Sequence, residues 1–485
     1  MPFIGVIKLG IIKKVNIYLR CFARFLVCAV FCVLIVMQKI SPLPKAAGEA
    51  ELLRDGVTVT MSGGLGSWTV RDGSRDSYMD IASGNEISVT STTDVYAVYF
   101  IWDSTPGEWT LETESEYSHY ATGFLHELVI LDEPSGDIRV ILSDTNFRLC
   151  EMYLFGEGEI PAWVQRWEPV LDRADLLALP THADDEHLFF GGILPTYAGE
   201  LGFDVQVAYM TSHWDNRVRP HELLDGLWTA GVTAYPLIGP FPDLFASKDS
   251  LANAETVYSR AEVLEYQVEL LRRFKPRVVV GHDLNGEYGH GAHILNAQTL
   301  VEAIELSGDE TYYPNSLAKY GVWDVPKTYL HLYAENQLVM DWNKPLDRFG
   351  GATAYETAVE SFAKHVSQSP YFAVTQGGTW EDCRKFGLVR STVGPDVLKN
   401  DLFENIDMSP PETPEPSPTA EPTPEPTPEP TAATVTPVPT EQPPEPDSDS
   451  AVMLWVLRAL VALLVILVLL ALMSLARPKK GRRRR

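Results

Sequence analysis

Residues 181–187 read Thr181-His182-Ala183-Asp184-Asp185-Glu186-His187, with two histidines and three acids in one short stretch. The apolar run 176–180 leads into this stretch, and the largely apolar run 188–192 follows it. The pattern predicts a turn between a buried strand and a helix. In open α/β sheets, ligands bind outside the carboxyl ends of the strands. The turn is therefore expected to carry the functional groups of the chain.

Strand and helix patterns alternate around this turn, between residues 170 and 405. Further strands are predicted at 204–210 and 278–280, because both runs are apolar or β-branched. Helices are predicted at 220–228, 260–274 and 292–306, where apolar residues recur at helical spacing; Pro276 ends the second of these helices. Strand, helix and strand at such intervals indicate parallel βαβ units and an α/β fold.

Residues 51–165 have a different pattern, which predicts an all-β sandwich domain. Runs rich in β-branched and aromatic residues alternate with Gly, Asp and Ser turns, as expected for short strands. The predicted strands are 57–60, 86–89, 95–100 and 137–142. Three tryptophans in this region are able to stack on sugar rings, but core positions are the more frequent use of such residues. They are Trp68, Trp102 and Trp109.

Both ends of the chain predict export and membrane attachment. Residues 1–48 combine a basic start, an apolar run and small residues, as in a signal peptide or a signal anchor. Residues 409–448 are a repetitive Pro, Thr and Glu stretch, which predicts a disordered, extended stalk. Residues 451–476 are apolar enough for a transmembrane helix. The basic tail 477–485 is expected to be cytoplasmic, which places the rest of the protein outside the cell membrane.

Charge argues against a nucleic-acid partner. The chain of 485 residues has 65 acidic and 39 basic residues, and the segments 1–45 and 477–485 hold fourteen of the basic ones. The strongly acidic body should repel nucleic acid, which requires basic surface. Outside the first apolar segment only Cys150 and Cys383 remain, so no disulfide framework or zinc-thiolate pattern is present in the sequence. The sequence does not decide whether these two thiols form a disulfide or stay separate. It also does not indicate the oligomeric state.

A second polar loop follows the strand at 278–280 and complements the first. Residues 281–293 contain three histidines, a tyrosine and two acids. Because carboxyl ends of parallel strands share one sheet edge, both loops are expected to open on the same side. His182 and Asp185 can reach one metal ion together, with a third ligand from the second loop. Two histidines and a carboxylate with an open fourth position are typical of catalytic zinc, which activates water and polarises carbonyls.

Each loop alone has a simpler explanation, as a helix cap or a solvated connector. Their combination favours a metal site and also resembles a known family. Thr181-His182-Ala183-Asp184-Asp185-Glu186 resembles the His-Pro-Asp-Asp-Glu signature of the PIG-L/LmbE-like zinc-dependent de-N-acetylases. Tyr288-Gly289-His290-Gly291-Ala292-His293 resembles the second motif of that family. The resemblance covers roughly residues 170–370. It implies a Rossmann-like α/β fold and hydrolysis of the acetamide of N-acetylglucosamine-type sugars.

The resemblance also implies a ligand set. By position, His182, Asp185 and His293 would bind Zn²⁺, although another divalent metal is compatible with these ligands. Asp184 lies next to a ligand and would act as general base on the water at the zinc. A carboxylate suits this role because it can accept the proton.

Other roles follow from the same resemblance. Tyr288 and His290 would stabilise the oxyanion or protonate the leaving amine. Arg219, in an Arg-x-x-Glu segment, would bind substrate hydroxyls. His365, in a His-x-Ser-Gln segment, would lie close to the substrate pocket.

Two positions depart from the family pattern. Ala183 stands where proline is usual, which should loosen the turn without removing a ligand. Ala292 stands where an acid orients a neighbouring histidine, which leaves the role of His290 in question. Asp283 or Glu287 are candidates to replace that acid.

Together these observations predict an exported, membrane-tethered, zinc-dependent enzyme that removes acetyl groups from N-acetylated amino sugars of a surface glycan. The anchoring pattern suggests a Gram-positive-like bacterial surface. Two alternatives remain. The same site would serve a zinc amidohydrolase acting on a non-sugar amide. The chain would also suit a surface carbohydrate-binding protein whose hydrolase fold no longer turns over.

Overall fold

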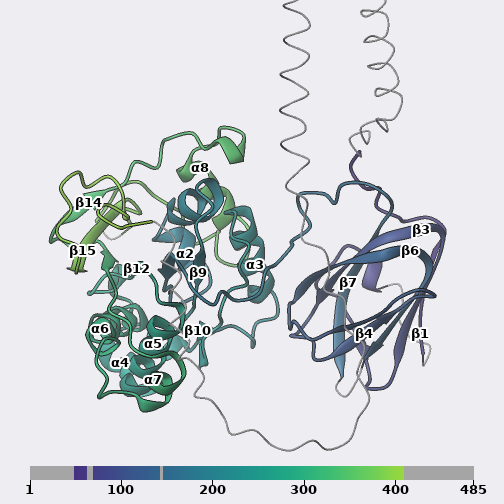
Figure 1. Ribbon diagram of the computed structural model, residues 1–485, viewed down its shortest axis with the longest axis horizontal. Coiled ribbons are helices and arrows are strands. Elements are labelled where there is room, and N and C mark those ends of the chain that lie inside the picture. The colour runs from purple at the N-terminus through teal and green to yellow at the C-terminus, as the bar shows by residue number, and fades with distance from the viewer. Residues whose placement is uncertain (1–47, 63–68, 143–145, 380, 409–485) are drawn as a thin grey trace, which may run out of the picture. The chain divides into compact units, whose positions relative to one another are not determined.

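The computed structural model of the chain describes residues 48–62, 69–142, 146–379 and 381–408 (Figure 1). The predicted signal segment, stalk, transmembrane helix and basic tail lie outside these residues, as does Trp68. Among the described residues, no helix has the length and apolar character needed to cross a membrane.

The N-terminal part is an antiparallel sheet of seven strands. These are β1 (Val57–Met61), β2 (Met79–Ile81), β3 (Glu86–Trp102), β4 (Trp109–Glu112), β5 (Tyr117–Tyr120), β6 (His126–Leu142) and β7 (Phe147–Phe155). The strand order is β2-β7-β3-β6-β4-β5, and β1 pairs with β3. The strands agree with the all-β prediction for this region, whereas the two-layer sandwich and the domain boundaries stay predictions.

Two strands are longer than their sequence suggests. Both β3 and β6 have 17 residues, and the predicted strands at 86–89 and 95–100 are parts of the same strand β3. The pairing of β3 with β6 shifts register between Thr90 and Val95, so a strand irregularity stands where a turn was expected. The side chains of Trp102 and Trp109 are fully buried, which makes them core residues of this sheet.

A mixed sheet of six strands forms the second part. Its strands are β8 (Leu176–Ala178), β9 (Val205–Val207), β12 (Val278–Gly281), β13 (Lys327–His331), β14 (Gln337–Val339) and β15 (Lys385–Ser391). They lie in the order β14-β15-β13-β12-β8-β9. The pairs joining β13, β12, β8 and β9 are parallel, and β15 and β14 are antiparallel additions. The strands β10 (Thr211–Ser212) and β11 (Phe241–Pro242) form a short parallel pair.

Helices cover both faces of this sheet. They are α2 (Asp185–Leu188), α3 (Arg219–Thr229), α4 (Leu251–Val257), α5 (Arg260–Phe274), α6 (Gly291–Leu306), α7 (Pro314–Tyr320) and α8 (Ala354–Phe362). Shorter helical turns are Thr69–Arg71, Pro195–Glu200, Phe245–Ser247, Glu287–Gly289 and Asp347–Phe349. Figure 1 shows α4 to α7 on one side of the sheet and α2, α3 and α8 on the other. The predicted mixed α/β architecture is therefore present.

The alternation of the strands explains the two layers. Leu176 and Ala178 of β8 pack in the same apolar cluster as α2, α3 and α8. Leu177 lies between them in the sequence and packs with α5 and α6 on the opposite face. Every residue of β8 and β12 is buried, as expected for parallel strands covered by helices on both sides.

Local sequence signals set the ends of the predicted helix α5 and the start of α8, which was not predicted. The Ser259 side chain accepts a hydrogen bond from the Glu262 N–H and so caps α5. Lys275 ends that helix in a left-handed conformation, and Pro276 follows it. Both bonds of a capping box, between Thr353 and Glu356, begin α8.

The antiparallel sheet contacts helix α3 through polar side chains. Arg75 forms an ion pair with Asp225 of α3, at 2.6 Å between Nη1 and Oδ2. His126 at the start of β6 contacts His221 of α3, with 2.8 Å between Nε2 and Nδ1. Gln165 contacts both His126 and Asp225. Helix α3 begins at Arg219, so these contacts lie close to a predicted substrate-binding residue.

Candidate active site

The two predicted loops meet at one edge of the parallel sheet. Strands β8 and β12 are hydrogen-bonded neighbours, with Ala178 beside Val280. The turn that contains His182 leaves the carboxyl end of β8. The loop that leaves the carboxyl end of β12 leads into the first turn of α6, which contains His293. This placement brings the two motifs together, as the strand-end rule predicts.

Three side chains form a compact set of ligand atoms. His182 Nδ1 lies 3.1 Å from His293 Nε2 and 3.3 Å from Asp185 Oδ2. His293 Nε2 and the same Asp185 oxygen are 3.3 Å apart. A tetrahedral metal with bonds of about 2.0 to 2.1 Å would separate neighbouring ligand atoms by roughly 3.3 to 3.4 Å. The three atoms therefore fit one face of a zinc coordination tetrahedron.

Glu287 orients three buried histidines, two from the segment after β12 and one at the end of β13. Its Oε2 atom lies 2.9 Å from Nδ1 of His293 and 2.8 Å from Nδ1 of His282, and its Oε1 atom lies 2.8 Å from Nδ1 of His331. The carboxylate is fully buried and accepts the N–H of each ring. A carboxylate behind a histidine ligand fixes its tautomer and leaves the other nitrogen free to bind metal. Glu287 thus orients His293, whereas Nδ1 of His290 has no hydrogen-bond partner among the described residues.

His282 lies against the cluster but is a poor candidate ligand. Its ring stacks on His293 with 4.2 Å between ring centroids. The N–H of Thr181 donates to His282 Nε2 at 2.9 Å, and the other nitrogen faces Glu287. Both ring nitrogens are therefore occupied, and His282 supports the turn from beneath.

Asp184 is held in an unusual conformation beside the ligand set. Its φ angle is 125°, a region that side-chain-bearing residues rarely adopt, and it immediately precedes helix α2. Burial raises the pKa of Asp184 to about 7, although the charge of Arg219 acts in the opposite direction. One Asp184 oxygen lies 3.6 Å from the Arg219 guanidinium, which also donates to the Ala183 carbonyl. The carboxylate of Asp184 lines the cavity next to the ligands.

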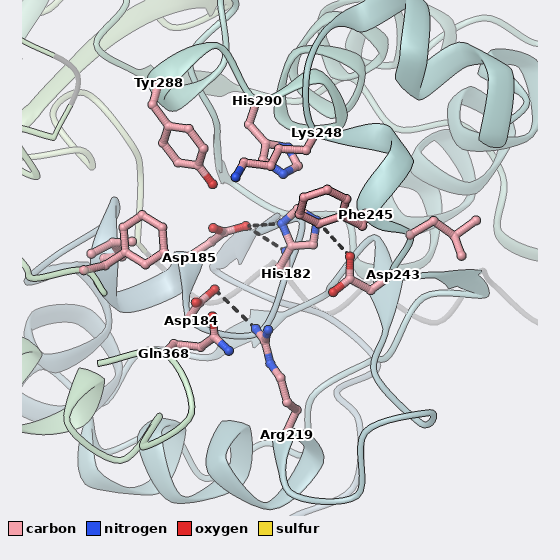
Figure 2. Close-up of a pocket in the computed structure, with 13 residues that line it drawn as sticks. His182, Asp184, Asp185, Arg219, Asp243, Phe245, Lys248, Tyr288, His290 and Gln368 are labelled. Atoms are coloured by element: carbon pink, nitrogen blue, oxygen red, sulfur yellow. Dashed lines mark hydrogen bonds and ion pairs between the residues drawn. The ribbon is translucent and has the colours of Figure 1, made fainter. Parts of the chain in front are cut away.

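Tyr288 and His290 lie across the cavity from Arg219 (Figure 2). The His290 ring stacks on His293 with 4.3 Å between centroids. Burial, and then the neighbouring His293, lower the pKa of His290 to about 2, so the ring is neutral. Burial raises the pKa of Tyr288 above its usual value, so its hydroxyl keeps its proton. Both side chains can therefore donate a hydrogen bond into the cavity.

The cavity has a volume of about 280 Å³. It is lined by His182, Asp184, Asp185, Leu188, Arg219, Asp243, Leu244, Phe245, Lys248, Tyr288, His290, Gln368 and Phe372. Sequence reasoning missed the segment 243–248, because no motif or periodicity marks this loop after β11. It also missed Gln368, although the His-x-Ser-Gln pattern that includes it was noticed.

Asp243, which the sequence did not indicate, contacts the proposed ligand His182. One of its oxygens lies 3.6 Å from His182 Nε2, and the other lies 3.2 Å from His213 Nδ1. Burial opposes ionisation of Asp243, but the bond from His213 and the charge of His182 outweigh it and lower the pKa. The carboxylate therefore sits behind His182 as Glu287 sits behind His293.

His365, which was expected close to the substrate pocket, is not among the residues that line the cavity. Its side chain is fully buried and faces Glu186, with 3.2 Å between Nε2 and Oε1. The reason is that the chain after α8 turns inward at His365. Gln368, three residues later, is the member of this segment that reaches the cavity.

Part of the chain is similar in sequence to curated sugar deacetylases. A 1D-myo-inositol 2-acetamido-2-deoxy-alpha-D-glucopyranoside deacetylase of Catenulispora acidiphila is 27% identical over 187 residues, covering 34% of this chain and 57% of the relative. The Saccharopolyspora erythraea protein with the same name is 30% identical over 171 residues, covering 30% and 61%. The chain thus spans about 60% of the length of these curated relatives. They confirm the family resemblance that the two motifs indicate.

No family model matches the chain. Among solved structures, the N,N'-diacetylchitobiose deacetylase of Pyrococcus horikoshii is 21% identical, with a TM-score of 0.30, and covers 40% of this chain and 71% of that chain. A deacetylase of the teicoplanin biosynthesis pathway is 15% identical, with a TM-score of 0.26, and covers 40% and 84%.

Proposed function

We propose that this protein is a zinc-dependent hydrolase that removes acetyl groups from N-acetylated amino sugars. The observation that carries the proposal is the ligand set of His182, Asp185 and His293, with Asp184 beside it in an open cavity. The names of the curated relatives support the same reaction class. A metal ion at these ligands would polarise the acetyl carbonyl and make water easier to deprotonate.

The side chains around the ligands supply the remaining chemistry. Asp184 accepts the proton of the attacking water and later delivers it to the leaving nitrogen. Tyr288 and His290 donate hydrogen bonds towards the acetyl oxygen as negative charge develops there. The water oxygen bonds to the acetyl carbon, the carbon–nitrogen bond breaks, and acetate and a free amine result.

Arg219 plays a supporting part in this scheme. It donates to the Ala183 carbonyl and faces Asp184, so it holds the turn, and its side chain also lines the cavity. Phe245 and Phe372 line the same cavity and offer apolar surface to a sugar ring. The acidic and aromatic lining suits a neutral or amino sugar better than a polyanion.

The setting of the enzyme is part of the proposal. The catalytic part would be a Rossmann-like domain, preceded by an all-β sandwich domain that adjoins it. The sequence pattern of residues 1–48 and 409–485 supports export and tethering through a single C-terminal span. The substrate would then be a surface glycan or glycoconjugate of a bacterial, Gram-positive-like cell.

An acetate-release assay tests the reaction. The zinc-loaded protein is incubated with N-acetylglucosamine oligomers, cell-wall glycan and N-acetylated glycolipid, and acetate and new amines are measured. Release that disappears in Asp184→Asn supports the proposal. Cleavage restricted to non-sugar amides would identify a different amidohydrolase, and glycan binding without any release would identify a binding protein.

A further inference from the structure

A second cluster of buried ligand-type side chains lies behind the catalytic turn. It consists of Glu186 and His187 in α2 and His365 after α8, and each of the three is fully buried. One ligand atom from each lies within 4.8 Å of the other two. The cluster shares no residue with the proposed catalytic ligand set.

Two of the three distances between ligand atoms in this cluster are close to those at the catalytic ligands. Glu186 Oε1 lies 3.3 Å from His187 Nε2 and 3.2 Å from His365 Nε2. The oxygen and both nitrogens have no partner with hydrogen-bond geometry among the described residues, so each contact is an ion pair only where the histidine is protonated. Ligand atoms around one metal show this pattern, since their lone pairs point at the ion and not at one another. The separations are also those of neighbouring ligands about 2.0 to 2.1 Å from a tetrahedral metal.

Protein atoms supply few of the hydrogen bonds that the polar atoms of this cluster could form. Both nitrogens of His187, both nitrogens of His365 and one oxygen of Glu186 are buried without a hydrogen-bond partner in the described part of the chain. Buried polar atoms are normally paired, and a group of five at one place calls for an explanation. A single protonated histidine would neutralise Glu186 but would leave most of the ring nitrogens unpaired.

The packing around the cluster leaves its nitrogens facing a glycine. A Cβ atom at Gly226 of α3 would lie 2.7 Å from His187 Nε2 and 2.9 Å from His365 Nε2. The two rings therefore converge on one point at the junction of α2, α3 and the end of α8. The hydroxyl of Tyr209 is also buried without a partner in the described residues, and burial and the charge of Glu186 raise its pKa.

From this convergence we propose that Glu186, His187 and His365 bind a second divalent metal ion of the zinc type at a closed structural site. Two imidazoles and a carboxylate are a ligand set that such metals accept. The ion would join α2 to the chain after α8, two segments far apart in the sequence. This site goes beyond the proposed deacetylase reaction and does not depend on it.

The second site would act on the catalytic turn through Glu186. The other oxygen of Glu186, Oε2, accepts the N–H of Asp184 at 2.8 Å. An ion on Oε1 would fix the Glu186 carboxylate and with it the strained backbone of Asp184. Its role would therefore be positioning, because the ion itself would have no contact with the cavity.

Metal stoichiometry tests the proposal on the full-length protein. After reconstitution with Zn²⁺ and removal of free metal, mass spectrometry of the metal should give about two zinc ions per chain. His187→Gln and His365→Gln should each lose one ion, and so should His182→Gln and His293→Gln. His119→Gln, which changes an exposed histidine of β5, is the matched control and should keep both ions.

A second measurement does not depend on how the variants fold. An anomalous difference map of the wild-type protein at the zinc absorption edge should show two peaks, one of them between Glu186 and His365. A single peak at His182 and His293, together with about one zinc ion per chain, would overturn the second site. That result would leave the deacetylase proposal intact, whereas two bound ions without acetate release would refute the deacetylase alone.

Discussion

The Oε2 atom of Glu287 lies 2.9 Å from Nδ1 of His293, which turns the Nε2 atom of that ring towards Asp185. Glu287 comes from the same loop as His293 and stands six residues before it. One carboxylate therefore determines which nitrogen of a proposed metal ligand is available.

Replacing Glu287 by glutamine should weaken metal binding. The neutral amide no longer accepts strongly from the histidine N–H groups, and loss of such an outer partner typically costs about 10- to 100-fold in metal affinity. Competition with a zinc chelator measures the change. Glu335→Gln, on an exposed loop, is the control and should bind zinc as the wild type does. Unchanged affinity in Glu287→Gln would contradict the orienting role.

Replacing Asp184 by asparagine should lower kcat by about 10²- to 10⁴-fold, because a general base is lost while the side chain keeps its size. Metal content should stay as in the wild type, since Asp184 is not among the proposed ligands. Acetate release and zinc content are measured on the same sample. A variant that loses zinc together with activity would make Asp184 a ligand and not a base.

Replacing Phe245 by alanine should raise KM for glycan substrates several-fold and leave kcat and metal content nearly unchanged. The ring lines the cavity yet is 83% exposed, so little folding energy depends on it. A change in the free energy of unfolding within about 0.5 kcal/mol is expected. Steady-state kinetics with oligomers of increasing length measure the effect. An unaltered KM for every oligomer would remove Phe245 from the substrate site.

Replacing Gly226 by alanine should destabilise the protein, although alanine is the better helix former. The gain in helix propensity is about 1 kcal/mol, whereas overpacking a buried site typically costs about 1 to 3 kcal/mol. The new Cβ would approach two histidine rings to under 3.0 Å, so the cost should exceed the gain. Thermal unfolding measures the balance. Gly308→Ala, whose Cβ has no neighbour closer than 3.8 Å, is the control.

The free energy of unfolding should fall as pH rises from about 4 to 7, and the buried carboxyl group of Glu127 is the cause. Burial raises its pKa to about 7, and the hydrogen bond from Thr122 only partly offsets this. Between the unfolded value near 4.3 and about 7, the unfolded chain releases this proton while the folded protein keeps it, so unfolding is favoured. The free energy of unfolding should drop by about 3 kcal/mol across this window and stay level above it.

Glu127→Gln should remove this part of the pH dependence, since the amide does not titrate. Denaturant unfolding at several pH values compares it with the wild type and with Glu114→Gln, an exposed control. Equal slopes in all three proteins would show that Glu127 ionises freely in the folded state.

The sequence predicted those parts of the site that come from strand ends. The proposed ligands His182 and His293 each follow a strand that was recognisable from apolar runs, and parallel neighbours share one edge. Helix α5 was recognisable because its cap at Ser259 and its end at Pro276 agree with its apolar spacing.

Residues that reach the site from irregular segments were not predictable in this way. Asp243 and Gln368 lie on loops without periodicity, so only the folded chain brings them to the cavity. The inward position of His365 depends on packing between α2, α3 and α8, which a local motif does not encode. The strand irregularity between Thr90 and Val95 of β3 has the composition of a turn, and its sheet neighbours decide the outcome.

The pairing of His126 with His221 has a consequence for the order of events during synthesis. Ribosomes release the antiparallel sheet before helix α3, and N-terminal domains generally fold first. The side chains that contact α3, namely Arg75, Gln165 and His126, would thus be in place before Asp225 and His221 leave the ribosome. The antiparallel sheet would serve as a folding template for α3, and a variant that lacks the residues up to Gln165 would have to form α3 without it.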